Sequence, residues 1–267
     1  MTRPTLLAAG LLLCLTVNAC APSIPSRQSQ IVTPKTGIDV LRAMHDRYAG
    51  KWFRTLTFQQ ATTLTKPDGT KSVTTWYEAV RSPRLLRIDI GEPPAGNGVL
   101  YTPDSVIALR GGKVVRARAE GNPFLPFVVG VYTQPLDTTI AQLAPWKFDL
   151  SKVSQATFEG RPVYVVGADS GSDATPQFWV DADRLILVRM IVPLGPASPY
   201  DIRLLNYQKA GDSWVATHIS MSQNGKEVQA EDYTDVRADT PLSPDLFDPL
   251  KWTTAPHWHT STSSGSN

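Results

Sequence analysis

Hydrophobic and polar residues alternate with a period of two along most of the chain. Within 52–60, Leu56 and Phe58 share one face of an extended chain, and the threonines and glutamine between them share the other. Residues 85–90 repeat this pattern. Such alternation predicts strands that turn one face toward a core. Residues 37–48 differ, because their apolar positions recur at helical spacing, so we expect one amphipathic helix there.

Turn sequences separate the alternating segments, and Asn224-Gly225 is the sharpest hairpin signal among them. Consecutive hairpins predict an antiparallel meander of about ten or eleven strands. Residues 123–151 interrupt the meander with apolar segments that we expect to be helical, of which 124–132 is the most apolar. We therefore predict a mainly β fold, in which a few helices cover the concave side of a strongly curved antiparallel sheet.

The first twenty residues follow a different pattern. Arg3 precedes an apolar run from 6 to 15, and small residues lead to Cys20. This order is typical of an export signal peptide, and a run of about ten residues is too short to span a bilayer. A cysteine directly after the small residues favours a bacterial lipoprotein leader, in which acyl chains are attached to Cys20. A plain signal peptide is the alternative.

Composition along the chain predicts four regions. Residues 1–19 would be the cleaved leader, and 20–35, rich in serine, proline and glutamine, a flexible tether. Residues 36–252 would form the folded domain, and 253–267 a disordered tail. Ala21 is not the aspartate that retains lipoproteins in the inner membrane of enteric bacteria, so we expect an outer-membrane anchor facing the periplasm.

Charge and motif content narrow the function further. A net charge of +2 over 267 residues gives no electrostatic basis for nucleic-acid binding. Cys14 lies in the leader, so the mature chain would hold no disulfide. His257 and His259 share one side of an extended segment, but without a third ligand they predict no metal site. Since the sequence also has no nucleophile elbow or catalytic constellation, we expect neither an enzyme nor a cofactor.

Three groups of residues carry a resemblance to a known superfamily. They are the helix 38–48 followed by 52–58, the segment 83–88 after a strand with Trp76, and 177–181 followed by 185–189. This combination is similar to the LolA/LolB-like superfamily of bacterial periplasmic lipoprotein carriers. The resemblance implies an incomplete β-barrel that is closed on one side by helices. It also implies a cavity that takes the acyl chains of lipoproteins or lipids.

A curved sheet with an apolar interior either fills itself with side chains or binds an apolar ligand. With 124–132 as a lid, the residues that we expect at the cavity are Leu56, Phe58, Trp76, Leu86, Ile88, Phe124, Phe127 and Trp179. We expect a lipid-anchored monomer in lipoprotein or lipid trafficking, with the membrane and an acyl ligand as its partners. The alternative is a structural or regulatory envelope lipoprotein whose core is self-filled and binds no ligand.

Overall fold

The computed structural model describes residues 33–169, 172–194 and 198–259. Cys20, the expected leader and nearly all of the expected tether lie outside the described residues, so lipidation and the domain limits stay predictions. From Pro34 onward, the described residues belong to one unit. No helix among them is both long enough and apolar enough to cross a bilayer.

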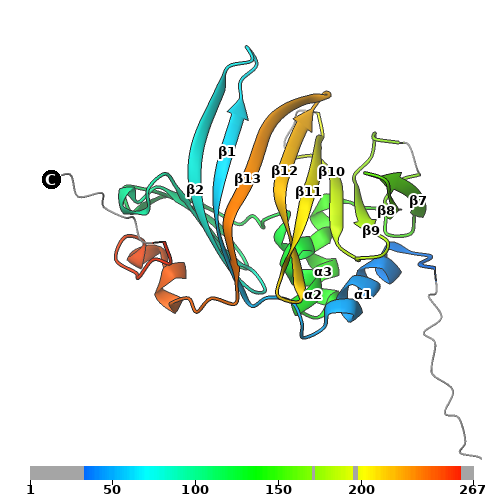
Figure 1. The fold of residues 1–267 in the computed structure, drawn as a ribbon, viewed down its shortest axis with the longest axis horizontal. Helices are drawn as coiled ribbons and strands as arrows, with labels where there is room; N and C mark the ends of the chain where they lie inside the picture. The colour runs from blue at the N-terminus through cyan, green and yellow to red at the C-terminus, as the bar shows by residue number, and fades with distance from the viewer. Residues whose placement is uncertain (1–32, 170–171, 195–197, 260–267) are drawn as a thin grey trace, which may run out of the picture. The chain divides into compact units, whose positions relative to one another are not determined.

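Within the described residues, thirteen strands form one antiparallel sheet in the order β6-β5-β4-β3-β2-β1-β13-β12-β11-β10-β9-β8-β7 (Figure 1). The strands are β1 (Thr55–Thr65), β2 (Lys71–Arg81), β3 (Leu85–Ile90), β4 (Gly98–Tyr101), β5 (Val106–Arg110), β6 (Lys113–Arg118), β7 (Val153–Phe158), β8 (Arg161–Val166), β9 (Gln177–Asp181), β10 (Leu187–Val192), β11 (Tyr200–Ala210), β12 (Ser213–Gln223) and β13 (Lys226–Ala238). The antiparallel meander is confirmed, and the expected strand number was slightly too low.

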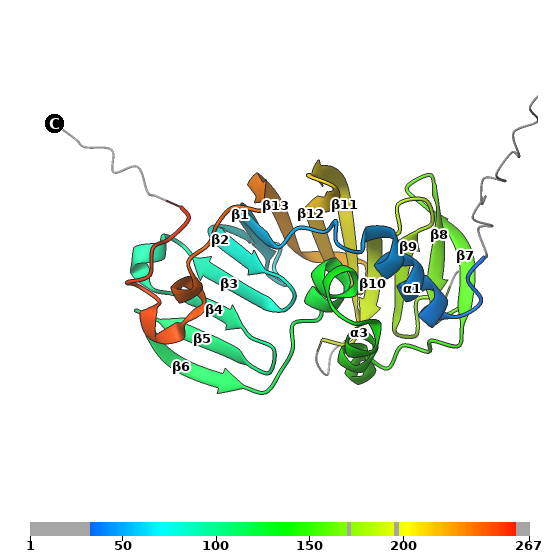
Figure 2. The ribbon, with the colours of Figure 1, turned by 90° about the horizontal axis from the view of Figure 1, so that it is seen from below.

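The order of the strands in the sheet differs from their order in the chain, because the chain starts in the middle of the sheet and later crosses from one edge to the other. Strands β1 to β6 lead to one edge, and the chain crosses to β7 at the other edge before it returns to β13, which pairs with β1. The sheet is open, because β6 and β7 form its two edges. Figure 2 shows the sheet curving around the helices that cover one of its faces, as the sequence predicts.

The helices lie where the apolar periodicity places them. α1 (Gly37–Tyr48) begins with a reciprocal cap, in which Thr36 Oγ1 accepts the Asp39 N–H and the Asp39 carboxylate accepts the Thr36 N–H. After β6 come a π-helical turn (Pro126–Gly130), α2 (Val131–Thr133) and α3 (Leu136–Leu143). Short 3₁₀ turns occupy Pro93–Ala95, Ala144–Trp146, Pro244–Phe247 and Pro249–Lys251.

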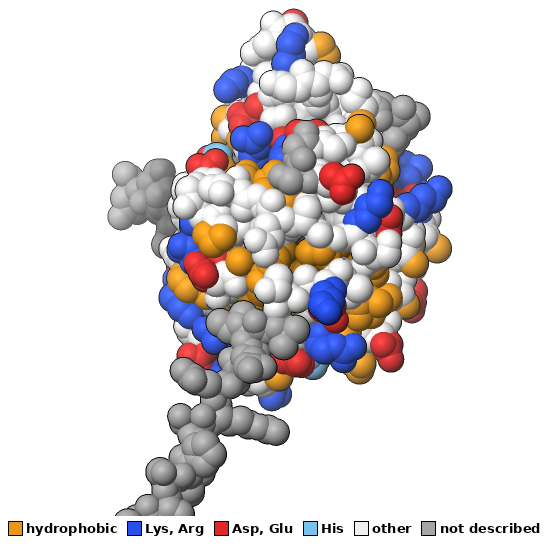
Figure 3. Space-filling view, turned by 90° about the vertical axis from the view of Figure 1, so that its right-hand side faces the viewer, with side chains coloured by type: hydrophobic (Ala, Val, Ile, Leu, Met, Phe, Trp, Pro, Cys, Tyr) orange, Lys and Arg blue, Asp and Glu red, His pale blue; other side chains and the backbone are white. Residues whose placement is uncertain are grey.

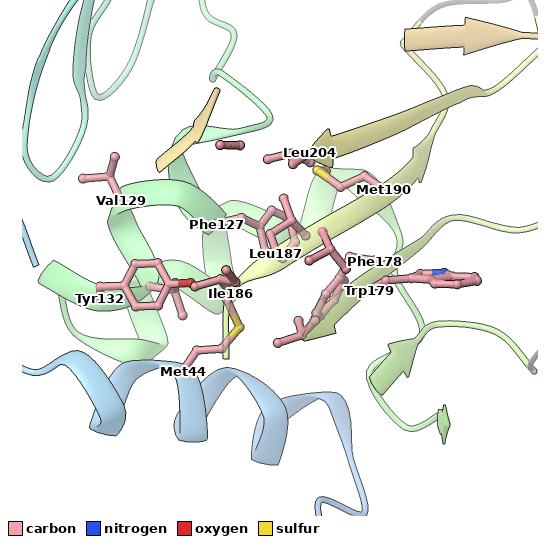
Figure 4. Packing of buried hydrophobic residues seen from close by; sticks show 14 of the residues in the cluster. Met44, Phe127, Val129, Tyr132, Phe178, Trp179, Ile186, Leu187, Met190 and Leu204 are labelled. Atoms are coloured by element: carbon pink, nitrogen blue, oxygen red, sulfur yellow. The ribbon is translucent and has the colours of Figure 1, made fainter. Parts of the chain in front are cut away.

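The main core lies between these helices and strands β8 to β12. Figure 4 shows Met44 of α1 and Phe127 of the π-helical turn on the same side of the sheet as Phe178 and Leu187. The ring centroids of Phe127 and Phe178 are 4.7 Å apart, and Met44, Phe127 and Phe178 are fully buried. Helix side chains therefore fill the concave face at this end of the sheet.

Trp52 and Tyr132 join the helical segment to the sheet. Their rings stack with centroids 3.7 Å apart, and Trp52 Nε1 donates to the Val128 carbonyl oxygen at 2.9 Å. Tyr132 Oη donates to the Leu185 carbonyl oxygen at 3.1 Å. These directional contacts hold the C-terminal part of 122–132 in place.

The C-terminal segment covers the opposite face of the sheet at β3. Arg87 Nε donates to Asp89 Oδ2 at 2.6 Å, both side chains are 1% exposed, and the guanidinium lies 3.8 Å from the Trp252 ring centroid. His257 Nε2 lies 3.1 Å from Asp89 Oδ2, so 253–259, expected within the tail, packs against β3. The polar residues of β3 are therefore buried as well as the apolar ones.

Candidate functional site

A cavity of about 310 Å³ lies between the concave face of the sheet and the segment 122–132. Strands β1 to β4 and β11 to β13 form its wall, together with Trp52 and Phe53 before β1 and the start of β10. Most of the lining side chains are apolar or aromatic. The cavity is therefore the part of the concave face that helix side chains leave unfilled.

The strand register explains why these side chains converge. Leu56, Val80 and Leu86 are successive cross-strand partners on β1, β2 and β3. Phe58 and Ile88 occupy the next row toward the other end of the strands. Cross-strand partners point to the same face, so alternation along each strand produces a largely apolar surface, which Glu78 interrupts between Phe58 and Ile88.

Seven of the eight residues expected at the cavity do line it: Leu56, Phe58, Trp76, Leu86, Ile88, Phe124 and Phe127. Trp179 does not. Its Nε1 donates to Gln177 Oε1 at 2.8 Å, and the Arg189 guanidinium lies 4.5 Å from its ring. Both faces of β9 are buried, and the neighbouring Phe178 takes the face that packs on the helices. That any of these side chains binds a ligand stays a prediction.

Two carboxyl groups in the cavity wall were missed by the sequence reasoning. Glu78 on β2 and Glu231 on β13 both line the cavity, and they are only 6% and 7% exposed. Glu231 accepts hydrogen bonds from Gln229 Nε2 at 2.6 Å and from Tyr233 Oη at 2.8 Å. Alternation does contain a signal for Glu78, because it lies two residues from both Trp76 and Val80 and therefore shares their face.

Burial dominates the electrostatics of these carboxyl groups. Burial raises the pKa of Glu78 well above its usual range, and the charge of Glu231 raises it further. Burial also raises the pKa of Glu231, although the hydrogen bonds from Tyr233 and Gln229 oppose the shift. The apolar wall therefore favours the protonated form of both groups over the bare carboxylate.

The other titratable side chains of the wall are tyrosines. Burial raises the pKa values of Tyr101, Tyr132, Tyr207 and Tyr233, so all four are neutral near pH 7. The described residues that line the cavity include no lysine, arginine or histidine. The wall thus holds two carboxyl groups and no cation to pair with them.

Outside the cavity, charge is dispersed. On the face shown in Figure 3, basic and acidic side chains are interspersed around scattered apolar ones. In the part of the chain that the structure describes, no group of His, Cys, Asp and Glu side chains is arranged to hold a metal ion. The apolar wall of the cavity can remove an apolar group from water. Its carboxyl and tyrosine side chains can form hydrogen bonds with a polar group.

No protein-family model matches the sequence, and comparison with the curated proteins gives no match. A DUF1329 family protein from Desulfovibrio piger superposes with a TM-score of 0.54 at 14% identity, over 79% of this chain and 95% of the other. An outer membrane lipoprotein-sorting protein domain from Vibrio parahaemolyticus gives 0.53 at 13% identity, over 81% and 98%. A LolA superfamily protein from Nitrosomonas europaea gives 0.50 at 15% identity, over 79% and 97%. At such identities the likeness establishes the fold, and the fold of this chain is LolA-like.

Proposed function

We propose that this chain binds the acyl portion of a lipoprotein or lipid, as a fixed carrier or acceptor in the bacterial envelope. The observation that carries the proposal is the apolar cavity between an open sheet and a helical cover. The same fold occurs in a lipoprotein-sorting domain and in a LolA superfamily protein. An acyl anchor at Cys20 would hold the protein at the outer membrane, facing the periplasm.

Burial alone would drive the transfer, with no chemical step. Removing an acyl chain from water is worth about 0.8 kcal/mol per CH₂, so a cavity of matching length competes with a bilayer. The volume of about 310 Å³ is at the lower end of the range, roughly 300 to 1,000 Å³, that is usual for ligand sites. The size favours one chain over several.

The segment 122–132 would act as the cover that opens. Asn122 Oδ1 accepts the backbone N–H groups of Phe124 and Leu125 at 2.8 and 3.1 Å, so one side chain holds the first turn of the cover. Phe124 is half-buried, whereas Phe127 is fully buried against the core. We expect the cover to open at Phe124 while Phe127 stays packed.

The test is whether lipid leaves the protein when the cavity is filled. Ala216 lines the cavity, so Ala216→Trp places an indole in the space, whereas Val73→Trp adds the same group at an exposed position on β2. The full chain is purified with its anchor, in a detergent distinguishable from lipid by mass. Organic solvent then extracts non-covalent lipid for mass spectrometry, and acyl chains attached to Cys20 remain with the protein.

We expect acyl species from the wild type and from Val73→Trp in amounts approaching one per protein, and several-fold less from Ala216→Trp. Equal and negligible amounts from all three proteins would overturn the proposal. That outcome would favour the alternative, an envelope lipoprotein that binds no ligand. Thermal unfolding of each variant shows whether the added indole has disturbed the fold instead of the cavity.

A further inference from the structure

Glu78 is an unpartnered acid in an apolar wall. Its side chain lines the cavity and is more than nine-tenths buried, and among the described residues it has neither a hydrogen-bond donor nor a cationic partner. Its carboxyl oxygens are not among the fully enclosed polar atoms, so they face the space of the cavity. Its cross-strand partners, Phe58 and Ile88, offer no polar atom from their side chains. The structure therefore leaves the Glu78 carboxyl without a partner from the protein.

A second buried acceptor lies beside it. Gln60 follows Phe58 by two residues on β1 and so shares its face, next to the cross-strand partner of Glu78. Gln60 Nε2 donates to Thr62 Oγ1 at 2.7 Å, but Gln60 Oε1 is buried and has no donor among the described residues. Glu78 and Gln60 thus lie on one face of the sheet and both lack a donor, but only Glu78 lines the cavity.

The remaining polar groups of the wall do not satisfy these acceptors. The carboxyl oxygens of Glu231 each accept a hydrogen bond from β13 itself, through Gln229 and Tyr233. Glu231 is a second acid near Glu78, and no cation lines the cavity. A carboxyl group with neither a donor nor a cation from the protein is complementary to a ligand group that carries several N–H donors and a positive charge.

We propose that Glu78 binds the ammonium group of a ligand whose apolar chain occupies the cavity. This inference rests on the proposed function, which supplies the apolar chain, and it names the polar end. The ammonium has three donors, enough for both oxygens of the Glu78 carboxylate. An amine headgroup of a phospholipid and a long-chain amine share this chemistry.

Binding of a cation would be linked to release of a proton. The empty cavity favours protonated Glu78, because burial and Glu231 raise its pKa. A bound ammonium favours the carboxylate, so the proton leaves, and affinity rises as pH rises. Three titratable groups face Glu78. The pKa of Glu231 is also raised by burial, and Tyr101 and Tyr233 stay neutral. His218 lies near Glu231, and its charge lowers the pKa of that carboxyl group.

The experiment compares two ligands that differ in one group. Dodecylamine and 1-dodecanol compete with the fluorescent apolar probe N-phenyl-1-naphthylamine on the full chain at pH 7. Because a charge-assisted hydrogen bond is stronger than a neutral one, we expect dodecylamine to bind about tenfold to a hundredfold more tightly than dodecanol. Glu78→Gln should abolish that advantage, so that dodecylamine and dodecanol bind about equally. Glu227→Gln, at an exposed position of β13, is the matched control.

Each outcome has one meaning. If the probe and both ligands fail to bind, the proposed function fails. If dodecanol binds as well as dodecylamine, or if the amine advantage survives in Glu78→Gln, this inference is wrong while the proposed function stands. An advantage lost in Glu231→Gln but not in Glu78→Gln would also overturn the assignment to Glu78.

Two further arms sharpen the chemistry. Calorimetry of dodecylamine binding in buffers of different ionisation enthalpy should show proton release by the wild type and less release by Glu78→Gln. Methyl dodecanoate, which has an acceptor and no donor, should bind no better than dodecanol; tighter binding that weakens as pH rises would mean that Glu78 acts as a neutral donor, against the proposal. Lauroyl lysophosphatidylethanolamine carries the ammonium on a phospholipid headgroup. If it competes as well as dodecylamine, the ligand's ammonium belongs to a phospholipid headgroup. If it competes more weakly, the ligand is a free amine.

Discussion

Two regions of the same concave face differ in how their space is filled. In the filled region, strands β8 to β10, aromatic side chains from the helical segment meet those of the sheet, and Phe127 lies 5.8 Å from Phe148 and 4.7 Å from Phe178 between ring centroids. In the cavity region, strands β1 to β4 with β13, Phe58 and Tyr233 stack on each other at 4.3 Å beside open space. Val166, Phe178 and Met190 face the helices in the filled region, whereas the wall of the cavity region holds two acids.

The difference follows from what covers each region. α1, α2 and α3 contact one another over the filled region, and α1 is pinned there by Tyr48 Oη, which donates to the Arg184 carbonyl oxygen at 2.6 Å. Over the cavity region the cover is the single segment 122–132. A close-packed core and an apolar cavity thus occupy different parts of one sheet.

The largest expected effect tests that division directly. Phe127→Ala should lower the free energy of unfolding by about 3 to 5 kcal/mol, because it removes a fully buried ring from the filled region. Phe124→Ala, at a half-buried position over the cavity, should cost about 1 kcal/mol. Chemical denaturation followed by tryptophan fluorescence measures both. Equal losses would mean that the cover is uniformly part of the core.

A buried ion pair behind the cavity region gives the next effect. Asp89→Asn leaves the guanidinium of Arg87 buried without its charged partner, which should cost about 3 kcal/mol. Amide hydrogen exchange should quicken in β3 to β5 and stay slow in β8 to β10. The control is Asp183→Asn in an exposed pair with Arg161, where we expect less than about 0.5 kcal/mol. Uniform loss of protection across the sheet would show that the two regions unfold together.

A pH-dependent effect should come from the cavity region alone. The folded-state pKa of Glu78 lies above its unfolded value, so its contribution to stability is complete below the unfolded pKa and is lost as pH rises through the folded pKa. Compared with Glu78→Gln, the wild type should therefore lose melting temperature as pH rises above the usual pKa of a glutamate. Glu227→Gln should follow the wild type. If the difference in melting temperature between the wild type and Glu78→Gln does not change with pH, the pKa of Glu78 is not raised on folding.

The smallest expected effect concerns the filled region. Thr36→Ala removes the side-chain cap of α1 and should lower the free energy of unfolding by about 1 kcal/mol. Displacement of N-phenyl-1-naphthylamine by dodecanol should not change, because α1 does not line the cavity. A change in ligand affinity without a change in stability would reveal coupling between the two regions.

Alternation and helical periodicity predicted most of the strands and helices, because both patterns depend on local geometry. Period-two spacing placed Leu56 and Phe58 on the inner face, and helical spacing placed α1. The same reasoning failed for Trp179, because a strand buried on both faces has no polar face to show which side is inner. Glu78 was missed for the opposite reason, since an acidic residue within a strand is ordinarily taken to face solvent.

Contacts between distant segments could not be predicted at all. Arg87 and Asp89 alternate with apolar residues as solvent-facing side chains would, and only the arrival of Trp252 and His257 buries them. The segment that supplies these contacts has the composition of a tail, and no local pattern in it specifies its docking site. The cavity volume likewise depends on how far apart the cover and the sheet come to rest.

The pairing of β1 with β13 has a consequence for how the protein assembles. Thr55 Oγ1 donates to the Thr240 carbonyl oxygen at 2.6 Å, across 185 positions of the chain. Synthesis begins at the N-terminus, so β1 to β4 are made early, yet β1 has no neighbour on one side until almost the entire domain exists. Such non-local pairing slows folding and leaves an unpaired edge open to aggregation meanwhile. The centre of the sheet, where β1 and β13 border the cavity, is therefore the last part to be completed, and a nascent chain would need protection there until its final strand arrives.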